Sequence, residues 1–296
     1  MAACAHAQAP LPPDVAAGQA ALLHAEELER AGQYREAALE YERVAQIERS
    51  TLGRDPARGL ARAAELWADK LSDPARAQSD CELAIRRYPD AAPADDAVRL
   101  LVRLRPPQLR ERLLALARSL DRHEVVDNLQ FEAAALIEQA APAQARAEYE
   151  ALAHSFPHSG LRDDALWRAA HIARAQRDGA GAMADLYAIT AQRRQPLLVG
   201  TYNSTWRDQA QLEIGRIWLE DRHDARRAVA AFELLRDEMT ESTLRDDAQM
   251  WIARAWAAAS ERIRACEALA RLRRDFPESR YLRKEAPALF AELGCR

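Results

Sequence analysis

Two segments decide the fold: Ser159-Gly160-Leu161-Arg162-Asp163-Asp164-Ala165 and Ser242-Thr243-Leu244-Arg245-Asp246-Asp247-Ala248, which agree at six of seven positions. Related junctions occur at Tyr88-Pro89, Phe156-Pro157-His158-Ser159 and Phe276-Pro277-Glu278-Ser279. Tyr88 and Phe156 lie 68 residues apart, which is twice a period of 34. Self-similarity at such a period is typical of architectures in which small structural repeats stack on one another.

The residues between these junctions repeat at fixed offsets, as in the helix–turn–helix unit of the tetratricopeptide repeat, whose period is 34 residues. In the second helix of each unit, a small residue is followed four and seven residues later by bulky or apolar ones, so that each set shares one helix face. The six sets are Ala37/Tyr41/Val44, Ala77/Cys81/Ala84, Ala145/Tyr149/Leu152, Ala182/Leu186/Ile189, Ala228/Phe232/Leu235 and Ala265/Leu269/Leu272. Small residues twelve positions before each set let the first helix approach closely: Ala25, Ala133, Ala170 and Ala253, with Gly215 one position further upstream and Glu65 as a departure.

The composition indicates the same fold class. The chain of 296 residues contains 65 Ala but only 10 Gly and 14 Pro, and aromatic residues make up 6%. Ala has the highest intrinsic helix propensity, whereas strands favour β-branched and aromatic residues. The formal net charge is −4, and no apolar run is long enough to span a membrane. We therefore predict an all-α protein, a right-handed α-solenoid, and exclude sheet proteins, membrane channels and basic nucleic-acid binders.

Two irregular stretches divide the expected repeats. We expect a disordered N-terminal tether at 1–16, repeats at 17–92, an irregular helical pair at 93–120 and further repeats at 121–290. In the irregular pair, Pro106-Pro107 prevents helix continuation and predicts an extended corner. The second irregular stretch is an apolar and aromatic insertion at 195–206, which either packs over the stack or contacts a partner.

The four cysteines show no metal-ligand spacing. Cys81 and Cys266 fall on apolar helix positions, where a free cysteine packs as a small hydrophobic residue. Cys4 follows Ala2-Ala3 and precedes a Pro-rich stretch, an arrangement that resembles the end of a bacterial lipoprotein signal. Cys4 is therefore a candidate lipidation site, and the alternative is an ordinary disordered N-terminus.

Sequence motifs of catalysis are absent, so we expect no enzyme activity, no catalytic residues, no cofactor and no metal site. The chain contains no GxSxG, P-loop, GxGxxG, HExxH or EF-hand pattern. The acid pairs Asp163/Asp164 and Asp246/Asp247 open helices after a serine, where capping and the helix macrodipole explain them; the alternative is a catalytic or cation-binding pair. We assign the tryptophans to the core between repeats, except Trp206 and the undecided Trp167.

The junctions with Phe-Pro-x-Ser and a following Asp-x-Ala resemble those of bacterial envelope proteins of the BamD (outer-membrane assembly lipoprotein) and CpoB (cell-division coordinator) type, within the tetratricopeptide repeat superfamily. The resemblance covers about residues 17 to 290 and is carried by Phe156-Pro157-His158-Ser159 and Phe276-Pro277-Glu278-Ser279. The resemblance implies an α-solenoid that holds protein partners in the periplasm or at the inner face of the outer membrane. A lipid on Cys4 would anchor it there. The alternative location is the cytoplasm.

Two hypotheses for the function follow. In the first, the chain is an interaction scaffold whose first helices line a groove for a peptide or helix of a protein partner, with neither a nucleic acid nor a small-molecule substrate. In the second, it is a structural accessory subunit of a fixed enzyme complex. Two groups of residues are candidates for contact with the partner. The polar groups that the repeat fold does not need are Arg168, His171, Arg174, Glu213 and Arg216, and the aromatic anchors of the insertion are Tyr202 and Trp206.

Overall fold

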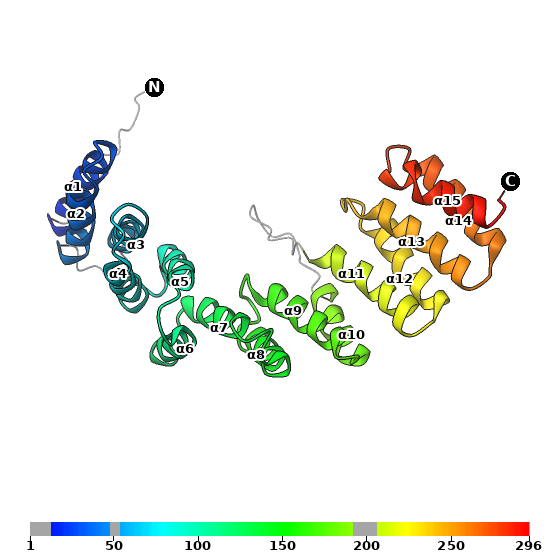
Figure 1. Ribbon diagram of the computed structural model, residues 1–296, viewed down its shortest axis with the longest axis horizontal. Coiled ribbons are helices and arrows are strands. Elements are labelled where there is room, and N and C mark those ends of the chain that lie inside the picture. The colour runs from blue at the N-terminus through cyan, green and yellow to red at the C-terminus, as the bar shows by residue number, and fades with distance from the viewer. Residues whose placement is uncertain (1–12, 48–53, 192–205, 296) are drawn as a thin grey trace, which may run out of the picture. The chain divides into compact units, whose positions relative to one another are not determined.

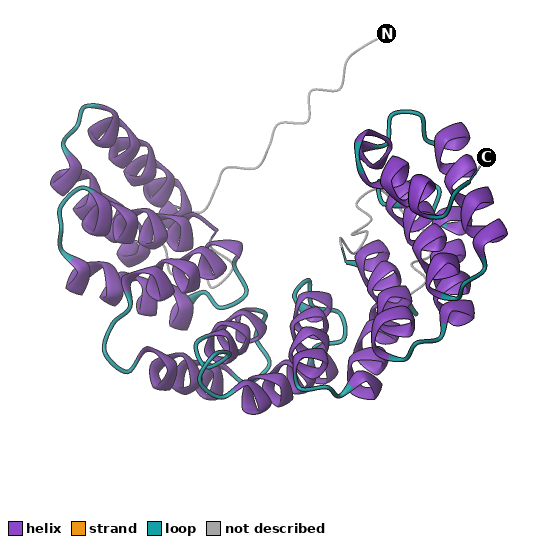
Figure 2. Ribbon diagram, turned by 45° about the vertical axis from the view of Figure 1, so that its right-hand side comes forward, coloured by secondary structure: helices purple, strands orange, loops and turns teal. Residues whose placement is uncertain are grey.

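The computed structural model describes residues 13–47, 54–191 and 206–295, and every regular element within them is helical (Figures 1 and 2). The chain forms two compact units, Met1–Ile137 and Glu138–Arg296. Unit 1 contains α1 (Pro13–Arg30), α2 (Tyr34–Ile47), α3 (Arg54–Asp69), α4 (Pro74–Arg87), α5 (Ala92–Leu104), α6 (Leu109–Leu120) and α7 (Val125–Ala135). Unit 2 contains α8 (Pro142–Ser155), α9 (Arg162–Ala175), α10 (Gly179–Thr190), α11 (Arg207–Arg216), η1 (Ile217–Asp221), α12 (Ala225–Glu238), α13 (Arg245–Ala258), α14 (Arg262–Asp275), η2 (Arg280–Arg283) and α15 (Glu285–Glu292).

The all-α prediction is confirmed, and the turns between paired helices follow from single residues. An aspartate caps the second helix of three pairs: Asp73 accepts from the backbone N–H of Arg76 (3.1 Å), and Asp178 from that of Gly181 (2.9 Å). Asp224 plays the same part at the start of α12. A side-chain oxygen at this position satisfies one of the N–H groups that a helix N-terminus leaves unbonded. Sequence and structure therefore agree on where each of these helix pairs reverses.

The predicted offset pattern forms the core of both units. All eighteen residues of the six sets are buried, as are Ala25, Ala133, Ala170, Gly215 and Ala253 on the first helices. Trp67 and Phe232 are among the largest fully buried side chains. Small residues on the facing positions allow the paired helices to approach closely, and the buried apolar area supplies the main favourable term in folding.

The repeat period is visible as hydrogen bonds between equivalent positions. Ser242 Oγ donates to Asp208 Oδ2 across 34 residues (2.7 Å), and Ser279 Oγ donates to Asp246 Oδ2 across 33 residues (2.7 Å). Each bond joins the junction of one repeat to the first helix of the repeat before it. Within each unit the helices therefore stack as helix–turn–helix pairs of the tetratricopeptide kind, in the manner of an α-solenoid.

This arrangement corrects the capping interpretation of the acid pairs. The residue at the N-cap of α13 is Leu244, with no side-chain cap, and the carboxylates bond to the next repeat instead. Asp246 accepts from Ser279, and Asp247 Oδ1 accepts from the Tyr281 hydroxyl (2.5 Å). Position in the first turn still suits the helix macrodipole. Asp246 and Asp247 thus connect successive repeats, as does Asp164, which accepts from Trp206, whereas Asp163 pairs with its neighbour Arg162.

The Pro106-Pro107 corner interrupts regular pairing in unit 1. The backbone enters the left-handed region on both sides of it, at Arg105 (φ 48°) and Gln108 (φ 55°), where we expected an extended segment. Helix α5 packs on α3 and α4, whereas α6 packs on α7. The prolines therefore separate α5 from α6 in the stack.

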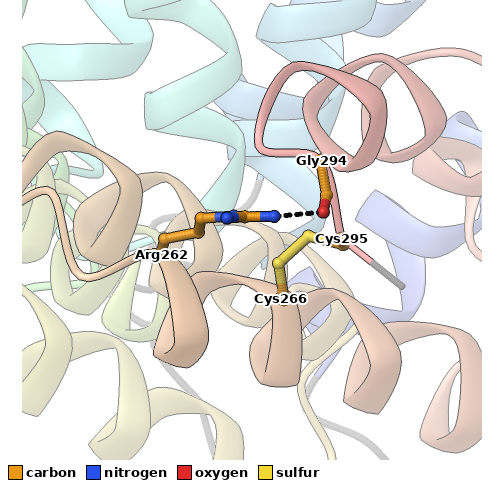
Figure 3. The surroundings of a disulfide bond; sticks show 4 residues. All are labelled: Arg262, Cys266, Gly294 and Cys295. Carbon is orange, nitrogen blue, oxygen red and sulfur yellow. Dashed lines mark hydrogen bonds between the residues drawn. A yellow bond between two sulfur atoms is a disulfide. The ribbon is translucent and has the colours of Figure 1, made fainter.

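A disulfide joins Cys266 on α14 to Cys295 beyond α15, which corrects the assignment of Cys266 to simple packing (Figure 3). The guanidinium of Arg262 also donates to the carbonyl of Gly294 at the same place. The two cysteines lie 29 residues apart, and a stack of repeats brings together residues about one repeat apart. Cys81 is a free and buried thiol, as expected.

Several expectations concern residues outside those described: Cys4, Tyr202 and the insertion up to residue 205. Helix α1 begins at Pro13, inside the stretch assigned to the tether, because proline suits the first position of a helix. Among the residues described, no helix combines the length and the apolar character needed to cross a membrane.

Candidate protein-interaction surface

Three of the candidate residues lie on α9 and two on α11, in unit 2. Arg168, His171 and Arg174 follow one another on α9 at helical spacing, and Glu213 and Arg216 lie on α11. We call this surface the α9–α13 strip and define it by Trp167, Arg168, His171, Arg174, Trp206, Glu213, Arg216, Trp251 and Arg254.

Arg174 is the centre of an ion-pair network within the strip. Its guanidinium donates to Asp221 Oδ2 (2.8 Å), to Glu220 Oε2 (2.6 Å) and to Glu213. The hydrogen bond to Asp221 has the largest effect on the pKa of Arg174 and raises it. Burial has the next largest effect and lowers it, but the pKa is raised overall. Arg216 bonds to Glu213 Oε2 (3.0 Å) from the other side. The network fixes α9 against α11.

The acceptors Glu220 and Asp221 are positioned by a local change of helix type. Residues Ile217–Asp221 form a π-helical segment, closed by a hydrogen bond from the Arg222 N–H to the carbonyl of Ile217 (3.0 Å). A π-type turn widens the helix, and such turns occur frequently at functional sites. Both carboxylates thereby reach the one guanidinium of Arg174.

Arginine side chains flank an indole further along the strip. The Arg216 guanidinium carbon lies 5.3 Å from the Trp251 ring centroid, and that of Arg254 lies 4.6 Å from the same centroid. Arg254 also pairs with Glu285 on α15. Cations at this distance are attracted by the ring quadrupole, and partly buried pairs of this kind contribute about 0.5–2 kcal/mol each. Trp251 therefore extends the strip from α11 to α13.

An aromatic stack forms the other end of the strip. The rings of Trp167 and Trp206 stack with centroids 4.6 Å apart, and His171 meets Trp167 edge-on at 4.4 Å. Trp206 Nε1–H donates to Asp164 Oδ1 (3.0 Å). Both tryptophans are half-buried, and the stack holds Trp206, the residue that ends the insertion, against α9.

Electrostatics link the aromatic end to the ion-pair network. Burial, the largest cause, lowers the pKa of His171; Glu213 and Glu138 raise it, and Arg174 and Arg216 lower it. The imidazole is therefore neutral at physiological pH and close to the charges of α11. The six described candidate residues thus lie on α9 and α11, with Trp206 at the N-cap of α11.

Glu213 and Arg174 were expected to be polar groups not needed for the repeat fold, but the two form an ion pair between α9 and α11. Glu213 is only 6% exposed and sits between two guanidinium groups. Arg168 fits the expectation better, because its side chain is 43% exposed while it bonds to Glu138 Oε2 (2.7 Å). Sequence reasoning assigned Trp251 to the core, against which it packs half-buried, and did not single out Arg254. The approach of both to Arg216 depends on the tertiary structure.

Unit 1 has a hollow of about 640 Å³ on its own first helices, which the sequence did not indicate. Residues of α1, α3 and α5 line it, with Tyr41 and Lys70 among them. Arg62 links Glu29 to Glu65 across the floor, and the Tyr41 hydroxyl donates to Glu29 Oε2 (2.9 Å). Its volume falls within the range of ligand pockets, and its lining is mostly charged.

The residues that the structure describes contain no group of three or more His, Cys, Asp or Glu side chains placed to hold a metal ion. Closely spaced carboxylates such as Glu220 and Asp221 instead surround an arginine. The strip can form hydrogen bonds, ion pairs and stacking contacts, which are the means of recognising another chain.

Comparisons with known proteins match no family model and no curated protein. Among solved structures, PilW, a type IV pilus biogenesis factor, shares 17% identity over 90% of this chain and 97% of its own, with a TM-score of 0.38. PilF of Pseudomonas aeruginosa shares 13% identity over 95% of this chain and 100% of its own, with a TM-score of 0.35. A putative kinesin light chain of Podospora anserina with TPR-like repeats shares 17% identity over 86% of this chain and 92% of its own, with a TM-score of 0.31. At these scores the fold assignment rests on the helices and contacts described above.

Proposed function

We propose that the protein is a non-enzymatic scaffold that holds a segment of a protein partner on the α9–α13 strip, in the envelope of a bacterial cell. The observation that carries the proposal is the gathering of half-exposed Trp167 and Trp206 beside Arg168 and His171 on first helices. Tryptophan and arginine are the residue types most enriched where binding energy concentrates in protein interfaces.

The strip is suited to binding because its rigid part is already in place. Arg174 and Glu213 connect α9 to α11, so the exposed groups on either side of them keep their positions when a partner arrives. Binding to a surface fixed in advance loses little side-chain and backbone entropy. A partner segment would contact the half-buried Trp167 and the 43% exposed side chain of Arg168.

The disulfide supports the proposed compartment. Disulfides form and persist in oxidising surroundings such as the bacterial periplasm and are rare in the cytosol. The Cys266–Cys295 bond therefore favours an envelope location over the cytoplasmic alternative. We retain Cys4, outside the described residues, as the proposed lipid attachment site.

The binding proposal is tested with Arg168→Glu and His171→Ala, two changes on the exposed part of the strip. Tyr187→Ala on α10 is the matched control, because Tyr187 is 47% exposed in the same unit but lies on a second helix. Quantitative co-purification of the full chain from its own cells, together with the melting temperature, separates binding from folding. We expect partner recovery to fall with both strip variants at unchanged melting temperature, and to persist with the control. Equal recovery from all three variants would contradict the proposal.

The lipid attachment is tested by metabolic labelling of the native gene product with a fatty-acid probe. Incorporation that disappears in Cys4→Ser supports the tether. Absence of incorporation, or incorporation that survives Cys4→Ser, would remove the anchor from the proposal and leave the strip unaffected.

The second candidate function is a structural subunit within a fixed complex. The hollow in unit 1 favours it, because its charged side chains already pair with one another and leave a broad polar surface for a large partner. In that case the chain would purify in a stoichiometric complex whose composition does not respond to the strip variants.

A further inference from the structure

Two aspartates occupy the same position in two repeats. Asp80 on α4 and Asp185 on α10 each lie three residues after the small residue that begins the buried set of their helix. At this position α12 and α14 carry alanine, Ala231 and Ala268, and α2 and α8 carry glutamate, Glu40 and Glu148. The fold therefore accepts a small apolar side chain here, and a carboxyl group is not required for packing.

Both carboxyl groups are buried and incompletely bonded. Asp80 and Asp185 are each 8% exposed, and in the described part of the chain the Oδ2 atom of each lacks a hydrogen-bond partner. A buried polar atom without a partner costs free energy, and an ionised one costs more. The neutral acid is thus the form that each site favours.

The charges around Asp80 increase this preference. Glu42 of α2 repels its ionised form, and Arg76 of α4 attracts it. Arg76, however, is engaged by Glu42 (3.5 Å) and by the ring of Trp67, whose centroid lies 4.0 Å from the guanidinium carbon. The net surroundings of Asp80 therefore remain unfavourable to a negative charge.

Helices α3, α5 and α6 also pack on α4. Glu65 of α3 and Arg103 of α5 act on the neighbouring Cys81 thiol. Arg112 of α6 pairs with Glu82, on the other side of α4 (3.1 Å).

The same arrangement recurs around Asp185. Glu150 of α8 and Asp178 at the start of α10 repel its ionised form, and Arg146 of α8 attracts it. Arg146 is shared between Glu150 (2.7 Å) and Asp178 (2.7 Å). From α9, Arg162 pairs with Asp163 (2.7 Å) and donates to a carbonyl of α10, and Arg222 after η1 lies beside Gly179.

Burial first, and the neighbouring glutamate second, raise the pKa of Asp80 and of Asp185 to about 7. An ordinary aspartate titrates near 4. Because the folded chain binds these protons more tightly than the unfolded chain, each site stabilises its unit increasingly as the pH falls from about 7 towards 4. Above pH 7 the full cost of the buried charge is present.

We propose that Asp80 and Asp185 are a duplicated acid-responsive element, one in each unit, that tightens the packing of the second helices when the surroundings become mildly acidic. The inference is independent of the proposed partner binding. It assigns a role to two buried acids whose repeat position holds alanine in α12 and α14.

The test is amide hydrogen exchange of the full chain at pH 8 and pH 5.5, with protection factors corrected for the intrinsic exchange rate. A single acid that shifts from about 4 to about 7 changes the opening equilibrium of its unit by about thirtyfold over this interval. We expect the most protected amides of α4 and of α10 to gain protection by up to that factor at pH 5.5. Asp80→Asn should remove this contribution in α4 only, and Asp185→Asn in α10 only.

Each variant is the control for the other unit, and circular dichroism verifies that both fold. Asp80→Ala and Asp185→Ala, which install the residue found in α12 and α14, should also raise protection at pH 8. Wild-type protection that does not rise on acidification, or Asn variants that retain the wild-type pH dependence in their own unit, would overturn the proposal.

Discussion

Gly215 and Phe232 show most directly how single residues determine helix spacing. A Cβ atom at Gly215 would overlap the ring of Phe232, which is fully buried. The absent side chain thus creates the space in which the largest core residue of α12 lies. The sequence indicated both residues by their offsets, because interhelical approach requires a small residue opposite a large one.

Gly215→Ala should lower the free energy of unfolding by about 1–3 kcal/mol, since overpacking forces the ring or the backbone to move. Gly160→Ala is the control, because nothing lies within 4 Å of the Cβ it would gain. Urea denaturation of both variants measures the difference. Equal stability of the two would mean that α11 and α12 are spaced differently.

Phe232→Ala should cost roughly 3–5 kcal/mol, because the removed ring leaves a cavity as well as losing its transfer free energy. Leu234→Ala on the same helix should cost far less, since Leu234 is 39% exposed. Thermal denaturation distinguishes the two, and an unchanged melting temperature for Phe232→Ala would disprove its core position.

At the same scale, burial of polar residues could not be predicted. Asp80 and Asp185 lie beside the predicted apolar face, and their burial depends on how the preceding repeat covers α4 and α10. Helix periodicity defines faces within one element only. The position of Glu42 or Glu150 relative to them belongs to the tertiary structure.

Between elements, Arg174 and Glu213 form the connection from α9 to α11. Arg174→Met should destabilise unit 2 by roughly 1–3 kcal/mol, because it leaves the 6% exposed Glu213 with one cation fewer. Adding Glu213→Gln should restore part of the loss. Denaturation of the two single variants and the double variant gives the coupling energy, and strictly additive effects would show that the two side chains do not interact.

The disulfide is the second connection between elements, joining α14 to the end of the chain beyond α15. A crosslink across 29 residues is worth about 3–4 kcal/mol in the chain-entropy description. Ala286 is the one buried side chain recorded for α15, so reduction should release this helix first. Hydrogen exchange with and without reductant should show faster exchange over 285–292 and unchanged exchange in α9. Protection of α15 that survives reduction would show that packing alone holds it.

At the scale of elements, the helix pairs could be predicted from the sequence and the π-helical turn could not. The helix pairs were predicted from the spacing of residues such as Ala228 and Gly215, because small residues recur where two paired helices approach each other closely. The π-helical turn at Ile217–Asp221 has no comparable signal, because its extra residue per turn is stabilised by the bonds of Glu220 and Asp221 to Arg174.

At the scale of the molecule, each unit buries a core that no single helix pair could bury alone, which is the general property of stacked repeats. The sequence predicted this architecture because equivalent contacts recur every 33–34 residues, as between Ser242 and Asp208. The candidate surface was predicted only as a set of residues. Its division into a structural centre at Arg174 and a more exposed end at Arg168 depends on three-dimensional contacts.

Site-specific photo-crosslinking in living cells tests the scaffold function most directly. A photoreactive residue replaces His171 on the α9–α13 strip, and in a matched chain it replaces the exposed Tyr187 on α10. The scaffold function predicts a discrete protein adduct from position 171 that is lost when Arg168→Glu is added, with none from position 187. No adduct at position 171, or the same adducts at both positions, would contradict it.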